Sequence, residues 1–174
     1  MLHVSALASR EIQLLVLTLR EAEPEIRKAI NKASKDTITT IWKQQILETS
    51  NATGGKTQKA RIKLIAKTAK VTVGNRGVTL TAATTGQPLS GGLSGKTNWQ
   101  GLEFGATANK ATVSFTNGAG TQYTQVRNVF AQLDFRRKKG YLFYPAARKA
   151  VPRILSLWVQ TSVRTLFDLV DGRR

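Results

Sequence analysis

The chain has 174 residues, a net charge of +17 and no cysteine. This length allows one domain with a real core, and the 41% hydrophobic fraction excludes a disordered basic tail. The lack of cysteine excludes disulfides and thiolate metal sites. The longest apolar run, Leu14 to Leu17, is too short to span a bilayer, and we read no secretion signal, so we expect a soluble intracellular product.

The positive charge is concentrated in the middle and the third quarter of the chain. Residues 1–48 carry seven bases and six acids, whereas residues 49–133 carry ten bases and one acid, Glu103. Residues 134–167 carry eight bases and one acid. Because such charge repels itself in a compact state, it indicates a polyanionic partner, either nucleic acid or an acidic protein surface. A solvated basic surface kept for solubility is the alternative.

The first 48 residues predict helix over residues 9–48. Ser9 is a candidate N-cap, followed by apolar residues at helical spacing. Pro24 suits a helix start, and the sequence leaves open whether it separates two helices or kinks one. The helix after Pro24 should end near Leu47. Its predicted apolar stripe consists of Ile26, Ala29, Ile30, Ala33, Ile41, Trp42 and Ile46.

The centre of the chain predicts strands and loops. Residues 56–67 fit either a short helix or a strand, and the alternation over residues 69–82 predicts a β-hairpin with a turn at Asn75-Arg76-Gly77. Residues 84–97 predict a long surface loop and residues 98–105 a short helical turn. A strand over residues 111–116 and a flexible loop over residues 117–125 follow.

A second long helix is predicted over residues 145–170. Its buried side carries Ile154, Trp158 and Ser162, and Pro152 lies in its first turn or kinks it. The whole pattern predicts an α+β fold, with a long N-terminal amphipathic helix and a C-terminal helix packed on a small, mainly antiparallel β-sheet with long loops. We expect residues 1–174 to form a single domain, with a hairpin and loops over residues 56–143.

The sequence offers little for catalysis, so we predict no enzyme and no cofactor. The single histidine, His3, lies at an expected frayed terminus, which leaves no cluster for acid–base chemistry or a metal site. We expect Glu103 to form an ion pair with one of the many nearby bases and not to act in catalysis. The two Gly-Lys-Thr triplets lack the earlier glycine that a phosphate-binding loop needs.

A basic run over residues 136–139 is the main candidate contact site. Four adjacent cations on an extended segment cannot all face one way, which favours contact with a phosphate backbone over reading of bases. Tyr141, Phe143 and Tyr144 follow at once and could stack on unpaired bases, although such residues more often anchor a loop to the core. The same interpretation as core residues applies to Trp42, Trp99 and Trp158.

The order of these elements resembles the tail-completion, or tail-to-head joining, family of long-tailed bacteriophages, and in particular neck proteins of phages that infect actinobacteria. The resemblance covers most of the chain and includes Gly-Leu-Glu-Phe-Gly at residues 101–105 and Tyr-Pro-Ala-Ala at residues 144–147. Its most specific parts are Glu103-Phe104-Gly105 and residues 138–163. The chain departs from the family pattern because no proline follows the first long helix. Its loop at residues 84–97 is also long, so loop contacts cannot be transferred.

The resemblance implies a structural subunit of the virion neck, assembled in the host cytoplasm. Copies of the chain, expected to number six, would form a ring between the capsid connector or stopper proteins and the tail terminator or tail tube. Double-stranded DNA would pass through the ring without sequence-specific contacts. The residues expected to contact DNA or an acidic partner are Arg136, Arg137, Lys138 and Lys139, followed by Lys56, Lys59, Arg61 and Lys63.

Other functions stay open. The chain could be a tail terminator or minor capsid component, or a free protein that binds nucleic acid without sequence preference. A metal-independent enzyme that uses Glu103 with a lysine is a further class of function.

Overall fold

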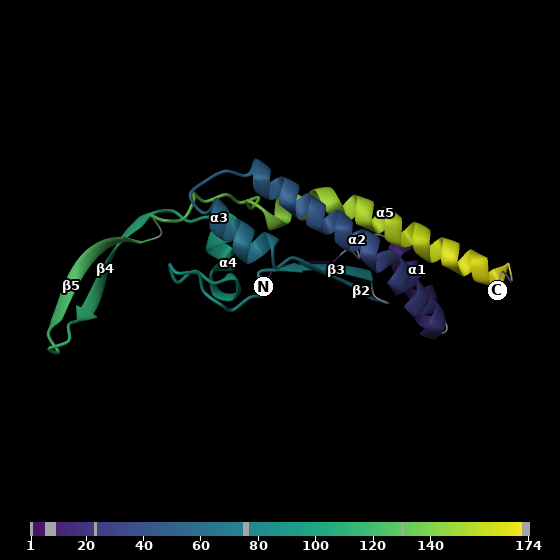
Figure 1. Cartoon of the computed structure of the whole chain (residues 1–174), viewed down its shortest axis with the longest axis horizontal. Helices are drawn as coiled ribbons and strands as arrows, with labels where there is room; N and C mark the ends of the chain where they lie inside the picture. Colours follow the sequence, from purple (N-terminus) through teal and green to yellow (C-terminus); the bar gives the residue numbers. More distant parts are fainter. Residues whose placement is uncertain (1, 6–9, 23, 75–76, 130, 172–174) are drawn as a thin grey trace.

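Two long helices and a small antiparallel sheet make up the body of the molecule, and a hairpin projects from one end (Figure 1). The structure is a computed structural model, and it describes residues 2–5, 10–22, 24–74, 77–129 and 131–171. The expected α+β class is confirmed. The elements are β1 (Leu2–Ser5), α1 (Arg10–Glu21), α2 (Pro24–Ala52), α3 (Gln58–Arg61), the π-helical η1 (Ile62–Ala66), β2 (Lys70–Gly74), β3 (Gly77–Ala82), α4 (Gly95–Phe104), β4 (Asn109–Thr116), β5 (Gln122–Val129) and α5 (Phe143–Val170).

The body contains a three-stranded sheet in the order β1-β3-β2, with both neighbours of β3 antiparallel to it. Pairs from Lys70 with Thr81 to Gly74 with Gly77 confirm the predicted hairpin, although Asn75 and Arg76 of its turn lie outside the described residues. The expectation of a frayed terminus at His3 is wrong, because His3 lies in β1 and pairs with Thr81. Leu2 to Ser5 alternate apolar and polar residues, but four residues are too few for this alternation to predict a strand.

The helix pair α2 and α5 packs over this sheet (Figure 1). Pro24 begins α2 and so separates it from α1, which resolves the alternative left by the sequence. The helix extends five residues past the predicted end at Leu47. Its buried stripe runs at four-residue spacing and differs from the predicted one, since Ala29 and Ala33 are exposed. The buried residues of α2 are Ile30, Ser34, Ile38, Trp42, Ile46, Thr49 and Ser50.

The start of α5 is fixed by aromatic packing against α2. Phe143, the first residue of α5, is fully buried. Its ring packs edge-on against that of Trp42, with 5.4 Å between the ring centroids. Trp158 is also fully buried, so both tryptophans are core residues as predicted. Pro152 is exposed inside α5 and lies beyond the first turn of the helix. The helix begins two residues before the predicted start.

The segment between the sheet and α5 departs from the prediction at several points. Residues 58–66 are helical, which resolves the ambiguity there. The helix α4 begins at Gly95, three residues early, because the Ser94 side chain accepts a bond from the Thr97 N–H and caps it. The predicted flexible loop over residues 117–125 is wrong in its second part, where β5 begins at Gln122.

The strands β4 and β5 form a hairpin, here called the arm (residues 109–129), that extends away from the body (Figure 1). Its register pairs Phe115 with Tyr123, whose rings stack at 5.5 Å, and Val113 with Gln125. Neither strand packs extensively against another described element. The arm has only two strands among the described elements, and two strands alone are marginally stable in water.

Candidate interaction site

The structure places seven of the eight predicted contact residues at the surface and buries the eighth. Arg61 is 1% exposed, so its prediction as a DNA or acidic-partner contact is wrong. The exposed residues are Arg136, Arg137, Lys138, Lys139, Lys56, Lys59 and Lys63. Lys56 reaches the adjoining segment through a bond from its Nζ to the Ala131 carbonyl. Lys59 and Lys63 lie on α3 and η1, where no described contact links them to residues 136–139.

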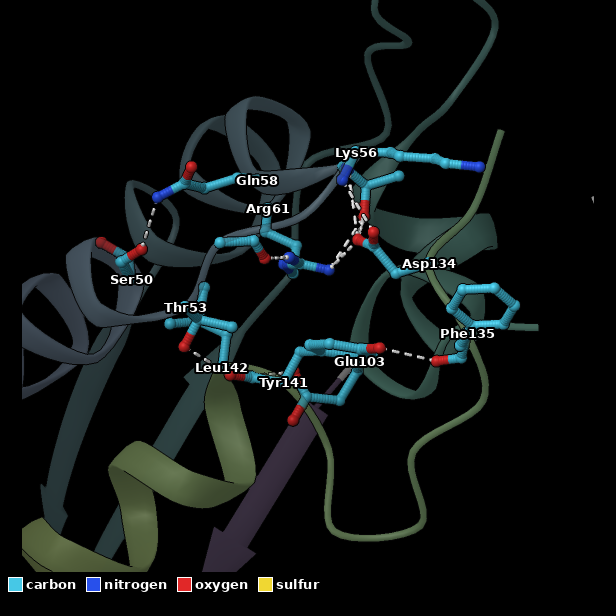
Figure 2. A network of polar contacts seen from close by, with 12 residues as sticks. Ser50, Thr53, Lys56, Gln58, Arg61, Glu103, Asp134, Phe135, Tyr141 and Leu142 are labelled. Atoms are coloured by element: carbon cyan, nitrogen blue, oxygen red, sulfur yellow. Dashed lines mark hydrogen bonds and ion pairs between the residues drawn. The ribbon is translucent and has the colours of Figure 1, made fainter. Parts of the chain in front are cut away.

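Asp134 explains why Arg61 is buried. One carboxylate oxygen of Asp134 lies 2.6 Å from Nη1 of Arg61 and 2.6 Å from the Thr57 hydroxyl (Figure 2). The carboxylate also accepts the backbone N–H groups of Lys56, at 2.7 Å, and Thr57, at 3.2 Å. Arg61 completes its own bonding with the Gly54 carbonyl and lies over the Tyr141 ring. These contacts fix the chain at Asp134 to the start of α3.

The environment of Asp134 also determines its ionisation. Burial acts to raise the pKa of Asp134 and is the largest single influence. The bonds from Thr57, Lys56 and Arg61 together outweigh it, so the pKa of Asp134 lies below its usual value. A side chain at Gly55 is excluded beside this site, because its Cβ would lie 2.6 Å from Asp134 Oδ1. The carboxylate is therefore a charged structural anchor.

Glu103 forms a second anchor, at the N-terminus of α5. Its fully buried carboxylate accepts the backbone N–H groups of Leu142, Phe143 and Tyr144 at 3.2, 2.9 and 3.0 Å. It therefore caps a helix, which corrects the expectation of an ion pair, because a carboxylate can satisfy several free N–H groups at a positive dipole end. Burial raises the pKa of Glu103, and the three N–H bonds and the charge of Arg61 offset part of that effect.

Residues 136–139, here called the basic loop, lie between these two anchors. The segment turns instead of extending, since the Gly140 N–H bonds the Arg137 carbonyl at 3.1 Å. Gly140 has a φ of +78° and packs against the Glu103 carboxylate, so a side chain there is excluded on both grounds. The Arg137 N–H also bonds the Phe104 carbonyl at 2.7 Å. The basic loop is thus held in place through its backbone.

The charges of the basic loop face solvent. All four side chains are exposed, and none forms an ion pair with an acid among the residues that the structure describes. The aromatic residues that follow anchor the loop, as the sequence analysis favoured. Tyr141 donates its hydroxyl to the Phe135 carbonyl at 2.7 Å, and Tyr144 stacks on Phe104 at 5.5 Å. Four uncompensated cations are therefore presented on a braced turn.

A cavity of about 790 Å³ lies beside the basic loop. Trp99, Phe104 and Leu133 contribute apolar surface to its wall, and Arg136, Arg137 and Lys138 contribute charge. Trp99 and Phe104 are partly exposed, so this surface is open to a ligand. Apolar and cationic groups side by side suit a partner that is both apolar and anionic.

Sequence reasoning missed Asp134 and the capping role of Glu103. Each pairs with groups far along the chain, at separations of 73–78 residues for Asp134 and 39–41 for Glu103, so no local pattern reveals them. One signal for them is present in the sequence: residues 49–167 contain only two acids, Glu103 and Asp134, among many bases. An isolated acid in so basic a segment is a candidate for a buried structural role.

Comparison with family models, with curated proteins and with solved structures finds no match to this chain. Among the described residues, no helix combines the length and the apolar composition needed to cross a membrane. The same part of the chain contains no group of three or more histidine, cysteine, aspartate or glutamate residues arranged to hold a metal ion.

Proposed function

We propose that the chain is a structural subunit of a phage neck, whose copies form a ring that joins the capsid connector to the tail. The observation that carries this proposal is the arm, a hairpin of two eight-residue strands, neither of which packs extensively against another described element. An edge of unpaired backbone groups on such a hairpin is normally covered by another chain. A subunit designed for assembly accounts for it.

The phage assignment rests on the resemblance of the sequence, and the geometry is compatible with it. The most specific motif is Glu103-Phe104-Gly105. Glu103 caps α5, Phe104 stacks on Tyr144, and Gly105 ends α4. These are structural tasks, as a joining protein requires. The basic loop would face either DNA in the channel or an acidic neighbouring protein.

Electron microscopy of intact particles tests this proposal. We expect copies of the chain in a ring between capsid and tail, and disruption of its gene should leave filled capsids and free tails unjoined. Purified particles that contain none of the chain would contradict the proposal.

The arm offers a separate test of assembly. Replacing residues 109–129 with a short glycine–serine linker should leave the body folded, because the arm contributes little to the core. The variant should keep the thermal unfolding midpoint of the body and fail to join capsids to tails. Full joining activity without the arm would show that it is not an assembly element.

A free nucleic-acid-binding protein is the second candidate, favoured by the four unpaired cations of the basic loop. It predicts submicromolar affinity for arbitrary duplex DNA, with affinity that falls steeply as salt rises. Unchanged binding between low and moderate salt would exclude this function.

A further inference from the structure

The cavity beside the basic loop is poorly suited to duplex DNA as its ligand. Phosphate contacts would use Arg136, Arg137 and Lys138 but would leave the apolar surface of Trp99 and Phe104 without a partner. The surface of a duplex is mainly phosphate and sugar and its bases expose only their edges in the grooves, so a duplex would leave most of this apolar surface uncovered. An acidic protein segment with an apolar side chain would use both kinds of wall.

The C-terminal end of α5 has this chemistry. Phe167 is 64% exposed, and Asp168 and Asp171 are exposed next to it. The other exposed aromatic residues of the described chain have no exposed acid beside them, since Asp134, which precedes Phe135, is buried and bound to Arg61. Tyr123 lies on the arm, whose residues 109–129 include no acid, and Phe135 adjoins the basic loop itself.

The charges near Phe167 leave its acids available. Arg164 and Asp168 lie 4.0 Å apart, and their side chains are 85% and 54% exposed. Such an exposed pair within one helix contributes only about 0.3–0.5 kcal/mol, so it exchanges readily for other partners. Contact with three cations of the basic loop would replace one weak ion pair with several. Arg173 and Arg174, which follow in the sequence, lie outside the described residues.

The two surfaces lie at opposite ends of one subunit. Figure 1 shows the C-terminal end of α5 at one extremity of the helix pair, and α4, which contributes Trp99 and Phe104, towards the other. A surface on one end that binds a different surface on the other end of a second copy is a heterologous contact. Repeated contacts of this kind close into a ring when the rotation permits.

We infer that the C-terminal end of α5 from one copy docks in the cavity of the next, with Phe167 against Trp99 and Phe104 and with Asp168 and Asp171 at the basic loop. The inference rests on the proposed ring, and it names the partner of the basic loop as a second copy of this chain. The basic loop then serves subunit contact, and DNA contact would fall to other residues.

Cysteine cross-linking tests the inference cleanly, because the natural chain has no cysteine. Two separate proteins, Arg164→Cys and Gln100→Cys, keep Phe167 and both acids; Gln100 lines the cavity. Mixed and treated with a short bismaleimide, they should form heterodimers. The matched control mixes Gln100→Cys with Ser156→Cys, an exposed position two turns earlier on α5. We expect the first mixture to exceed the control by about tenfold, which corresponds to about 1.4 kcal/mol.

The cross-link must also depend on the docking residues. Adding Phe167→Ala and Asp168→Lys to the Arg164→Cys protein should reduce the yield to that of the control, with unchanged circular dichroism. Equal yields in both mixtures, or a yield that these substitutions leave unaltered, would overturn the inference. If particles contain the chain but this cross-link does not form, the inferred contact is wrong and the proposed function stands. If the cross-link forms but particles lack the chain, the contact stands and the proposed function is wrong.

Discussion

The body of this molecule and its basic end are held together by different interactions. The basic end is the basic loop together with its two anchors, Asp134 and Glu103. In the body, apolar side chains of α2 and α5 bury one another, with Trp42, Phe143 and Trp158 fully enclosed. At the basic end, Asp134 precedes the basic loop and accepts the backbone N–H groups of Lys56 and Thr57. Glu103 accepts the backbone N–H groups of residues 142–144, which follow the loop. The difference teaches that buried carboxyl groups bound to backbone N–H groups can order a surface of positive charge, so the two regions should respond differently to mutation and to pH.

The largest effect is expected in the body, at Trp158. Truncation to alanine should reduce the free energy of unfolding by about 3–5 kcal/mol, because the ring is 0% exposed and leaves a large cavity. Trp99→Ala is the control, since this ring is partly exposed and should cost less. Urea unfolding measures both. A small change for Trp158→Ala would mean that the body tolerates a large void.

At the basic end, Asp134→Asn should cost about 3 kcal/mol at neutral pH, because it leaves the Arg61 guanidinium buried without its counter-charge. Asp36→Asn, at an exposed acid of α2, is the control and should change the free energy of unfolding by less than about 0.5 kcal/mol.

The effect of Asp134 should also depend on pH in a defined direction. The folded-state pKa of Asp134 is lowered, so its contribution is present above the unfolded pKa of about 3.9 and is lost as pH falls through the folded pKa. The gap in unfolding free energy between the wild type and Asp134→Asn should therefore narrow below about pH 4. A gap that stays constant down to pH 2 would contradict an ionised anchor.

Glu103 sharpens the comparison because its pH dependence should have the opposite sign. Glu103→Gln places an amide N–H₂ opposite one of three backbone N–H groups, which should cost about 1–3 kcal/mol. The folded pKa of Glu103 is raised, so its stabilising contribution is complete below the unfolded pKa of about 4.3 and is lost as pH rises through the folded pKa. The gap from the wild type should widen on acidification. A gap that narrows would show that burial does not dominate at this carboxyl group.

The sequence predicted much of the body and little of the basic end, for a physical reason. Helical periodicity and strand alternation are local, so α2, α5 and the β2–β3 hairpin could be found from neighbouring residues. The burial of Arg61 depends on Asp134, 73 residues away, and no spacing rule connects them. The strand β1 is equally nonlocal, since it is completed by pairing with β3. The α+β class was therefore predictable from the sequence. The role of Asp134, which buries Arg61 while the other predicted contact residues stay exposed, was not predictable.

The smallest effect on folding is expected from the basic loop itself. Converting Arg136, Arg137, Lys138 and Lys139 to glutamine should change the free energy of unfolding by less than about 0.5 kcal/mol for each residue, because the backbone holds the loop and the side chains form no ion pair with a described acid. The matched control neutralises four exposed lysines of α2, Lys28, Lys32, Lys35 and Lys43, and so carries the same net charge.

Subunit association should separate these two variants. Sedimentation at low salt should show weaker association for the loop variant than for the control, because only the loop cations line the cavity that we propose as the docking site. Association should also weaken with added salt in the control protein, as expected for exposed charges. Equal association of the two variants would mean that net charge governs assembly, and that the position of the cations between Asp134 and Glu103 has no role beyond the fold.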